Sequence, residues 1–558
     1  MAEERTVHVE ISGHGIVTVN EGTTLLDLKR RFVKEEQPLV PVVGALYDNR
    51  VSGLEYRVRR DCRVNFLTTE SEEGADIYRR SLSILLHAAF IDVNHAGATL
   101  KIEHSLSKGF YYTYLDGGDL SPDMVREIEN RMRELVDRDI PFEKREVEVE
   151  DALDIFHRIG AWDRYHLLRY SGKPKVVVYR LGDLYNLAQG PLVPATGYLK
   201  LFALVHHPPG LILLFPDPSD PCKLPGFTAQ KKLFQIYSEQ REWSRILNVE
   251  SAGKLNWFII KKKVTNLIWL SEGLHEKKIA GIADHIARHA RDRRVIFLAG
   301  PSSSGKTTFA KRLTIQLLAN GIDPEVLSLD DYYLPRNHMP LDEKGEVDYD
   351  SLHALDLGQI RTDLNALLDG RSVDIPHYDF KTGLQEPSGR SLRLEKDQVI
   401  IVEGIHGMNP ALASEVTREQ PFKIYISTLT QLNLDVINRI PTSTVRLIRR
   451  IVRDCYFRYS SARQTIVKWP RVRHGEEKNI FPFQEEADVM FNSSLVYEMS
   501  ILKGYVEPLL LDIDEDDPAY TRARMLLHFT SNFLYISPEH VPLTSILREF
   551  IGGSGFQY

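Results

Sequence analysis

The sequence predicts a multidomain protein that combines α/β and α+β units, on three observations. The chain has 558 residues, and at roughly 100–200 residues per domain it should form three or four domains. In the C-terminal half, short apolar runs alternate with amphipathic helical segments, which is typical of a doubly wound parallel sheet. In the N-terminal half, strand-like pairs flank single helices, which favours smaller α+β units. The resulting segments are 1–69, 70–217, 218–290, 291–505 and 506–558.

Composition excludes several classes of protein. Hydrophobic residues make up 43% and charged residues 26%, which rules out wholesale disorder. The net charge of −7 excludes a protein whose whole surface coats nucleic acid, although a local basic face is compatible with it. The 3 cysteines lie far apart, which argues against a disulfide framework or a cysteine-based zinc module. With no secretory leader and no apolar run that could span a bilayer, we expect a cytoplasmic protein without membrane contact.

The N-terminal half predicts two units. In residues 1–69, VHVEI and IVTV surround SGHG as a hairpin, TTLLDLKRRFVKE has helical spacing, and PLVPVVGALYDNR and RVNFLTT are strand-like, giving a ββαββ order. In residues 70–217, IYRRSLSILLHAAFI and SPDMVREIENRMRELVDRD predict helices, the second capped by Ser121 with Pro122 in its first turn. VVVYRLGDLYNL and YLKLFALVHH predict strands.

The C-terminal half begins after a linker, FPDPSDPCKLPG, that is rich in Pro and Asp. Residues 227–290 predict mostly amphipathic helices. Beyond 291, the apolar runs RRVIFLAG, PEVLSLDD, DQVIIVEG and FKIYIST predict parallel strands, and TTFAKRLTIQLLANG predicts a helix that ends at Gly321. The final 50 or so residues, about 506–558, predict a helical and then irregular tail.

The sharpest motif is the stretch GPSSSGKT at 300–307, which fits the pattern GxxxxGK[ST] between a strand and a helix. Its backbone N–H groups and the helix N-terminus favour phosphate, its lysine can reach the β- and γ-phosphates, and its threonine can ligate Mg²⁺. A chance Gly/Ser turn before a helix is disfavoured by the flanking elements. The expected ATP-binding residues are Gly300, Pro301, Ser302, Ser303, Ser304, Gly305, Lys306, Thr307 and Thr308.

Acidic residues at two strand ends indicate which class of phosphate-loop protein this is. No NKxD-type guanine-reading segment is evident, which argues against a GTPase. Asp330 and Asp331 end one strand and Glu403 ends another, so these carboxylates should meet at the edge where α/β proteins bind ligands. Acids at strand ends can also cap loops, but beside a phosphate loop they indicate a small-molecule kinase with an acidic base and an acidic Mg²⁺ ligand.

Residues of about 294–500 resemble the uridine kinase / phosphoribulokinase family in AGPSSSGKTT, SLDDYY, DYDSLHALD, DIPHYDF, VEGI and RLIRRIVRD. The resemblance implies a P-loop kinase that uses ATP and Mg²⁺ and transfers the γ-phosphoryl group to a small hydroxyl-bearing metabolite, first of all a nucleoside 5′-hydroxyl. It also implies a homo-oligomer, whose contacts the N-terminal extension could block. By position, the resemblance implies Asp330 as catalytic base, Lys306, Arg453 and Arg458 on the transferred phosphoryl group, Tyr333, Asp350, Tyr378 and Arg450 as substrate-binding residues, and Thr307, Asp330 and Glu403 as metal-binding residues.

The same region departs from the family pattern around the acceptor. Gly383 stands where the family places a base-reading histidine, and Ser351-Leu352 replaces the usual His-Pro. Ser460 replaces a lid arginine, although Arg463 is close by in the sequence. The acceptor therefore stays open: another sugar or polyol is one alternative, and an RNA- or tRNA-associated NTPase is another. A scaffold with a dead kinase is disfavoured because the phosphate-loop lysine and the three metal-binding residues are present.

The N-terminal half resembles threonyl-tRNA synthetases. VTVNEGTTLLDL and ALYDNRVSGL match their TGS domain, and LLHAAF, KGFYYTY and GDLYNLAQGPLVPATG match their second additional, editing domain. The resemblance places the editing ligands at Ser83, His87, Ala188 and Leu192, so we expect no metal and no editing there. The aminoacylation core is missing, which leaves RNA contact, ligand sensing or packing on the kinase as roles for this half. Lys261–Lys263 and the pair His285 and His289 are interpreted as surface residues.

Overall fold

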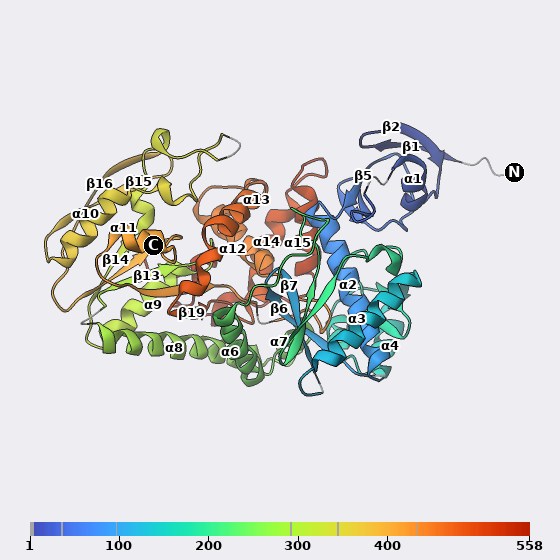
Figure 1. Cartoon of the computed structure of the whole chain (residues 1–558), viewed down its shortest axis with the longest axis horizontal. Helices are drawn as coiled ribbons and strands as arrows, with labels where there is room; N and C mark the ends of the chain where they lie inside the picture. The colour runs from blue at the N-terminus through green and yellow to red at the C-terminus, as the bar shows by residue number, and fades with distance from the viewer. Residues whose placement is uncertain are drawn as a thin grey trace.

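A computed structural model describes residues 5–34, 37–95, 97–115, 117–290, 293–342, 345–430 and 432–557. Figure 1 shows an elongated molecule with the N-terminal sheet (blue) at one end and the parallel sheet of the C-terminal half at the other. The last helices of the chain (orange to red) lie between these two ends, and the C-terminus returns to the parallel sheet.

The first unit is a five-stranded sheet in the order β2-β1-β5-β3-β4, with one helix against it. The predicted hairpin, helix and strands are confirmed, and a short extra strand, β4, makes the order ββαβββ. Thr24 begins the helix by accepting a hydrogen bond from the backbone N–H of Asp27. The elements are β1 (Thr6–Ile11), β2 (Gly15–Asn20), α1 (Leu25–Phe32), β3 (Val42–Tyr47), β4 (Arg50–Ser52) and β5 (Cys62–Thr68).

The second unit has two antiparallel sheets, β10-β9-β8 and β11-β12-β7-β6. Both predicted helices are present, and Ser121 caps the second of them as predicted, with Pro122 at its first position. The stretch YLKLFALVHH becomes a strand only from Ala203 onward. The helices are α2 (Glu72–Val93), α3 (Pro122–Asp137), α4 (Val149–Arg158) and α5 (Trp162–Arg169), and the strands are β6 (Leu100–Leu106), β7 (Gly109–Tyr114), β8 (Glu143–Glu148), β9 (Lys175–Leu181), β10 (Leu184–Leu187), β11 (Ala203–His207) and β12 (Gly210–Leu214).

Three helices follow the irregular segment 215–230: α6 (Lys231–Leu247), α7 (Ala252–Ile260) and α8 (Val264–His289). The side chains of Lys261–Lys263 are exposed, as are those of His285 and His289 on α8. The surface interpretation of both groups is confirmed. No described helix is long and apolar enough to cross a membrane.

The C-terminal half is built on a fully parallel sheet in the order β14-β17-β13-β18-β19, as predicted. Because the strands are parallel, their carboxyl ends meet at one edge, and the phosphate loop lies there. A separate antiparallel ribbon, β15-β16, leaves this sheet (Figure 1). The strands are β13 (Val295–Ala299), β14 (Pro324–Ser328), β15 (Val373–Asp379), β16 (Leu384–Leu392), β17 (Val399–Glu403), β18 (Phe422–Ser427) and β19 (Val489–Asn492), and the helices are α9 (Lys306–Ala319), α10 (Leu357–Leu368), α11 (Pro410–Val416), α12 (Thr442–Phe457), α13 (Ala462–Asn479), α14 (Glu498–Leu511), α15 (Tyr520–Thr530) and α16 (Arg548–Ile551).

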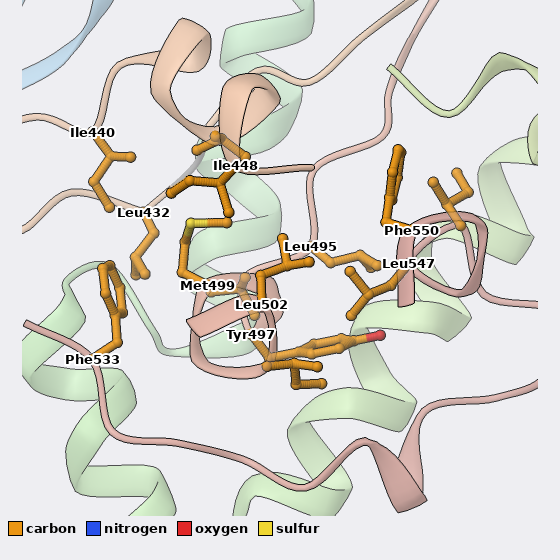
Figure 2. Packing of buried hydrophobic residues seen from close by; sticks show 14 of the residues in the cluster. Leu432, Ile440, Ile448, Leu495, Tyr497, Met499, Leu502, Phe533, Leu547 and Phe550 are labelled. Atoms are coloured by element: carbon orange, nitrogen blue, oxygen red, sulfur yellow. The ribbon is translucent and has the colours of Figure 1, made fainter. Parts of the chain in front are cut away.

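The C-terminal tail packs into the core of the parallel-sheet unit. Figure 2 shows Met499 and Leu502 of α14 beside Ile448 of α12, with Leu547 and Phe550 from the end of the chain closing the same cluster. Phe550 has no exposed surface, and burial of such a side chain stabilises a fold by about 1.5–3 kcal/mol. The tail therefore helps to hold α12, and the boundary at 505/506 stays a prediction.

Candidate active site

The phosphate loop, residues 300–307, connects β13 to α9 and requires glycine at both ends. A Cβ atom on Gly300 would lie 2.0 Å from the carbonyl oxygen of Ile426. Gly305 has a φ of +86°, and a Cβ atom there would lie 2.5 Å from Ile546 of the C-terminal tail. The Lys306 ammonium donates to the carbonyl oxygens of Gly300, at 3.1 Å, and Pro301, at 3.4 Å. The backbone of the loop thus binds the ammonium group of Lys306.

The predicted acidic groups converge beside this loop. Thr307 Oγ1 donates a hydrogen bond of 3.0 Å to Glu403 Oε1 at the end of β17. Ser328, the last residue of the neighbouring strand β14, pairs with Glu403, which places Asp330 at the same edge. Desolvation by the surrounding protein raises the pKa of Glu403 to about 7 and also raises the pKa of Asp330, whereas it lowers the pKa of Lys306. These shifts show that charged groups are crowded at an edge with little bulk water.

The raised pKa of Glu403 predicts a pH dependence of stability in the ligand-free protein. The folded state keeps a proton on this carboxyl up to about pH 7, whereas the unfolded chain releases it near the ordinary value of 4.5. More protons are bound in the folded state between these values, so the free energy of unfolding should fall by roughly 2–3 kcal/mol as pH rises through this window. Urea unfolding of wild type and Glu403→Gln at pH 4.5, 6 and 7.5 measures the difference. Parallel pH profiles for the two proteins would contradict the assignment.

Arginines of α12 cover the other side of the loop. Arg450 donates to Ser302 Oγ at 2.6 Å. Arg453 is paired with Asp454 at 2.8 Å, and its charge lowers the pKa of the Arg458 guanidinium. Arg453 and Arg458 both favour the ionised form of Asp330 electrostatically. The predicted lid arginines therefore lie together, next to the predicted base.

A buried ion pair braces the loop and was missed from the sequence. Arg446 and Glu476 form a two-point pair, with relative exposures of 1% and 2%. Glu476 accepts a hydrogen bond of 3.0 Å from the backbone N–H of Ser302, and Arg446 Nε donates to the Ser302 carbonyl oxygen at 2.9 Å. Both polar groups of the Ser302 backbone are thus held by this pair. Arg446 lies in the quoted stretch RLIRRIVRD, but nothing in the sequence marks Glu476, 174 residues from Ser302.

The C-terminal tail contributes a second unpredicted group. Glu549 Oε2 accepts hydrogen bonds from Thr308 Oγ1, at 2.7 Å, and from the Thr308 backbone N–H, at 3.3 Å. Its charge also raises the pKa of Glu403. A carboxylate therefore occupies the first turn of α9, where the helix N-terminus favours an anion.

Glu549→Gln should tighten the binding of Mg-ATP by about three- to tenfold, because it keeps an acceptor oxygen near Thr308 but removes a negative charge that repels the phosphates. Titration calorimetry with a non-hydrolysable ATP analogue measures the effect. Glu539→Gln, at an exposed position of the same tail, is the matched control. Unchanged or weaker binding in Glu549→Gln would mean that this carboxylate only supports the loop.

An aromatic group forms the predicted acceptor side. The rings of Tyr333 and Tyr378 lie 5.5 Å apart, and the ring of Phe380 lies 5.0 Å from Tyr378. Tyr333 donates to the carbonyl oxygen of Tyr349 at 2.9 Å, whereas the buried hydroxyl of Tyr378 has no hydrogen-bond partner among the residues that the structure describes. Phe380 is 54% exposed, whereas Tyr333 and Tyr378 are buried behind it, so Phe380 supplies the accessible face of this aromatic wall. Such a wall suits a flat ring with polar edges.

Arg336 lies where a side chain at position 383 would begin. Gly383 has a φ of +73°, and a Cβ atom there would lie 2.8 Å from Arg336 Nε. The guanidinium is held by the hydroxyl of Tyr349, at 3.1 Å, and the carbonyl oxygen of Phe380, at 2.9 Å. A planar cation thus covers the position where the family reads the base.

The remaining predicted residues divide between the site and its surroundings. Asp350 lies within electrostatic range of Arg450, and burial raises its pKa to about 6. A Cβ atom on Gly475 of α13 would meet its carboxylate at 2.2 Å, so glycine is needed for this close approach. Arg463 forms an ion pair with Asp517 of the C-terminal tail and does not substitute for the lid arginine lost at Ser460.

In the N-terminal half, His87 is buried at one of the positions where the resemblance places an editing ligand. The ring nitrogens of His87 lie 2.7 Å and 3.0 Å from the carbonyl oxygens of Ser83 and Leu100. Burial lowers the pKa of His87 to about 4, although its two carbonyl contacts act in the opposite direction. This environment supports a structural role. Ala188 and Leu192 bring only hydrocarbon side chains.

Comparison with known proteins agrees with the family resemblance that the sequence predicts for each half of the chain. Residues 295–499 match the model of the phosphoribulokinase / uridine kinase family. The N-terminal half matches threonine–tRNA ligases: that of Syntrophotalea carbinolica is 32% identical over 163 residues, covering 29% of this chain and 26% of the ligase. The ligase of Natranaerobius thermophilus is 29% identical over 202 residues, covering 35% of this chain and 30% of the ligase. The chain thus spans less than a third of the length of these relatives. A solved structure described as a possible uridine kinase from Bacillus stearothermophilus is 19% identical, with a TM-score of 0.26, and covers 38% of this chain and 97% of its own.

Proposed function

We propose that this chain is an ATP-dependent phosphotransferase that transfers the γ-phosphoryl group to a hydroxyl of a small metabolite, with a nucleoside 5′-hydroxyl as the first candidate. The match of residues 295–499 to the phosphoribulokinase / uridine kinase family supports a kinase. The observation that carries the proposal is the contact of Thr307 with Glu403, beside Lys306 and on the same sheet edge as Asp330. This is the combination that phosphoryl transfer needs: a cation for the phosphates, oxygen ligands for Mg²⁺ and a carboxylate base.

Different residues of the chain would perform different parts of the reaction. Thr307 and Glu403, with Asp330 nearby, would hold Mg²⁺, which neutralises charge on the β- and γ-phosphates. Asp330 takes the proton from the acceptor hydroxyl. The hydroxyl oxygen then forms a bond to the γ-phosphorus, while the bond between the γ-phosphorus and the bridging oxygen of the β-phosphate breaks and ADP is released. Lys306 and the lid arginines stabilise the charge on the transferred group.

The aromatic wall favours a nucleoside over an open-chain polyol. Phe380, backed by the buried rings of Tyr333 and Tyr378, offers ring surface that a sugar or polyol alone would leave exposed. Asp350 is the group that would accept hydrogen bonds from ribose hydroxyls. Arg336 presents donors only, so the base should offer acceptor atoms on the edge that faces it. A sugar or polyol kinase is the alternative within the same chemistry.

The test is ADP release by the purified protein with Mg-ATP and a panel of acceptors. The panel contains uridine, cytidine, adenosine, guanosine and inosine, together with ribose, glycerate and simple polyols. The proposal predicts that one nucleoside raises the rate at least a hundredfold above the rate without acceptor. A polyol that gives the highest kcat/KM would overturn the nucleoside assignment but keep the kinase. No stimulation by any acceptor would overturn the kinase.

The synthetase-like half supports a second candidate, an RNA-associated NTPase. Its similarity to threonine–tRNA ligases is the observation in its favour. This candidate predicts that tRNA stimulates ATP hydrolysis and that tRNA affinity falls steeply with salt.

We also propose a cytoplasmic location, in which the 3 free cysteines stay reduced. Formation of a homo-oligomer stays a prediction.

A further inference from the structure

A cavity of about 730 Å³ lies where the N-terminal sheet, the synthetase-like unit and the C-terminal helices meet. Its lining comes from β4, α2, β9, the segment after β10, the segment 434–444 and α15. The volume is in the range of small-molecule sites. None of the phosphate-loop, acidic, arginine or aromatic residues assigned to phosphoryl transfer lines it.

The cavity is strongly basic. Nine of its lining residues are Arg or Lys, and three are Asp or Glu. Arg79 uses one terminal nitrogen on Asp76, at 3.3 Å, and Arg80 donates to the carbonyl oxygen of Pro191 at 2.8 Å. Among the described residues, neither the buried Nε atom of Arg79 nor that of Arg439 has a hydrogen-bond partner. Buried guanidinium donors are rarely left unpaired, because each unpaired donor costs about 1–3 kcal/mol.

Arg439 is the least compensated of these arginines. Burial lowers the pKa of its guanidinium, and the positive charge of Arg79 lowers it further. Its nearest ring is Phe110, whose centroid lies 5.0 Å from the guanidinium carbon. Within the described residues, Arg439 has no carboxylate within ion-pair distance. Of these two neighbouring arginines, Arg79 is paired with Asp76 and Glu72, whereas Arg439 is left without such a partner in the described part of the chain.

We propose that this cavity binds an anionic metabolite whose phosphate or carboxylate group lies between Arg79 and Arg439. A planar guanidinium matches either group in two-point geometry through its terminal nitrogens. The apolar part of the ligand would lie against Phe110 and Phe529, which also line the cavity. The cavity also includes Ser83 and Ala188, two of the four positions at which the resemblance to threonyl-tRNA synthetases places editing ligands.

The position of Arg439 connects the cavity to the phosphate loop. Asn433 Nδ2 donates to the carbonyl oxygen of Ile102 at 2.5 Å, and the backbone N–H of Val436 donates to Asp163 at 2.8 Å. The segment is thus tied to the synthetase-like unit, and α12 begins at Thr442, three residues after Arg439. The same helix carries Arg446, which holds the phosphate loop. An anion on Arg439 would therefore change the affinity for Mg-ATP through the start of α12.

Two aromatic anions serve as probes: phenyl phosphate and benzoate. Each is titrated calorimetrically into the full chain after the phosphate loop has been saturated with Mg²⁺ and a non-hydrolysable ATP analogue. The variants are Arg439→Gln, which removes the charge, and Ala188→Trp, which fills the cavity and keeps every arginine. Arg126→Gln, on the exposed face of α3, is the matched control. Thermal unfolding of each variant checks that it is folded.

We expect at least one probe to bind wild type and the control equally, at least tenfold more weakly to Arg439→Gln, and not at all to Ala188→Trp. Binding of phenyl phosphate alone assigns a phosphate ligand, and binding of benzoate alone assigns a carboxylate ligand. The proposal is overturned if neither probe binds wild type or if both variants bind as wild type does. The coupling to α12 predicts that the bound probe changes the Kd for the non-hydrolysable ATP analogue at least twofold in wild type and not in Arg439→Gln. Because binding is read without turnover, the result stands whether or not the kinase proposal holds.

Discussion

Asp330→Asn should lower kcat by about 10²- to 10⁴-fold. The amide cannot accept the acceptor proton, and because Asp330 also lies beside the proposed Mg²⁺ ligands, we expect the KM for Mg-ATP to rise by a smaller factor. Steady-state kinetics at saturating Mg-ATP and the best acceptor measure the loss.

Asp331→Asn is the matched control for this prediction. Asp331 is the adjacent carboxylate, but it contacts His377 at 3.2 Å and not the loop. We expect its kcat within about threefold of wild type. Equal losses in the two variants, or a wild-type rate in Asp330→Asn, would show that Asp330 is not the base.

Arg446→Met should destabilise the fold by at most about 3–5 kcal/mol, because it leaves the buried Glu476 carboxylate with Arg473, at 3.4 Å, as its remaining cationic partner. It should also weaken Mg-ATP binding at least tenfold, since the Ser302 carbonyl oxygen loses its donor. Urea unfolding and analogue titration measure the two effects separately.

The double variant Arg446→Met/Glu476→Leu separates stability from binding. Replacing both charges with apolar groups removes the desolvation penalty, so most of the unfolding free energy should return. Mg-ATP binding should stay weak, because neither side chain can then hold the backbone of Ser302. If binding recovers together with stability, the pair has no specific role at the loop.

The parts of the site that could be predicted are those encoded by neighbouring residues. The phosphate loop is one continuous motif, and Asp330 and Glu403 follow strands whose apolar runs are plain in the sequence. Parallel strands force such residues to one edge, so their meeting follows from topology alone.

The parts that could not be predicted depend on contacts between distant segments. Glu476 and Glu549 lie 174 and 241 residues from the loop residues they contact, and no local pattern encodes such distances. Arg336 over Gly383 is likewise a tertiary contact: the sequence indicates a missing histidine but not the cation in its place. The tail was expected as a separate segment, whereas Leu547 and Phe550 complete the packing around α12 and α14 (Figure 2).

The most direct test of phosphoryl transfer to a metabolite is a ³¹P NMR spectrum of the complete reaction: protein, Mg-ATP and the best acceptor. We predict one new phosphate monoester resonance that grows in equal amount with ADP, without inorganic phosphate. Inorganic phosphate as the only product beside ADP would show hydrolysis instead of transfer and would contradict the proposed function.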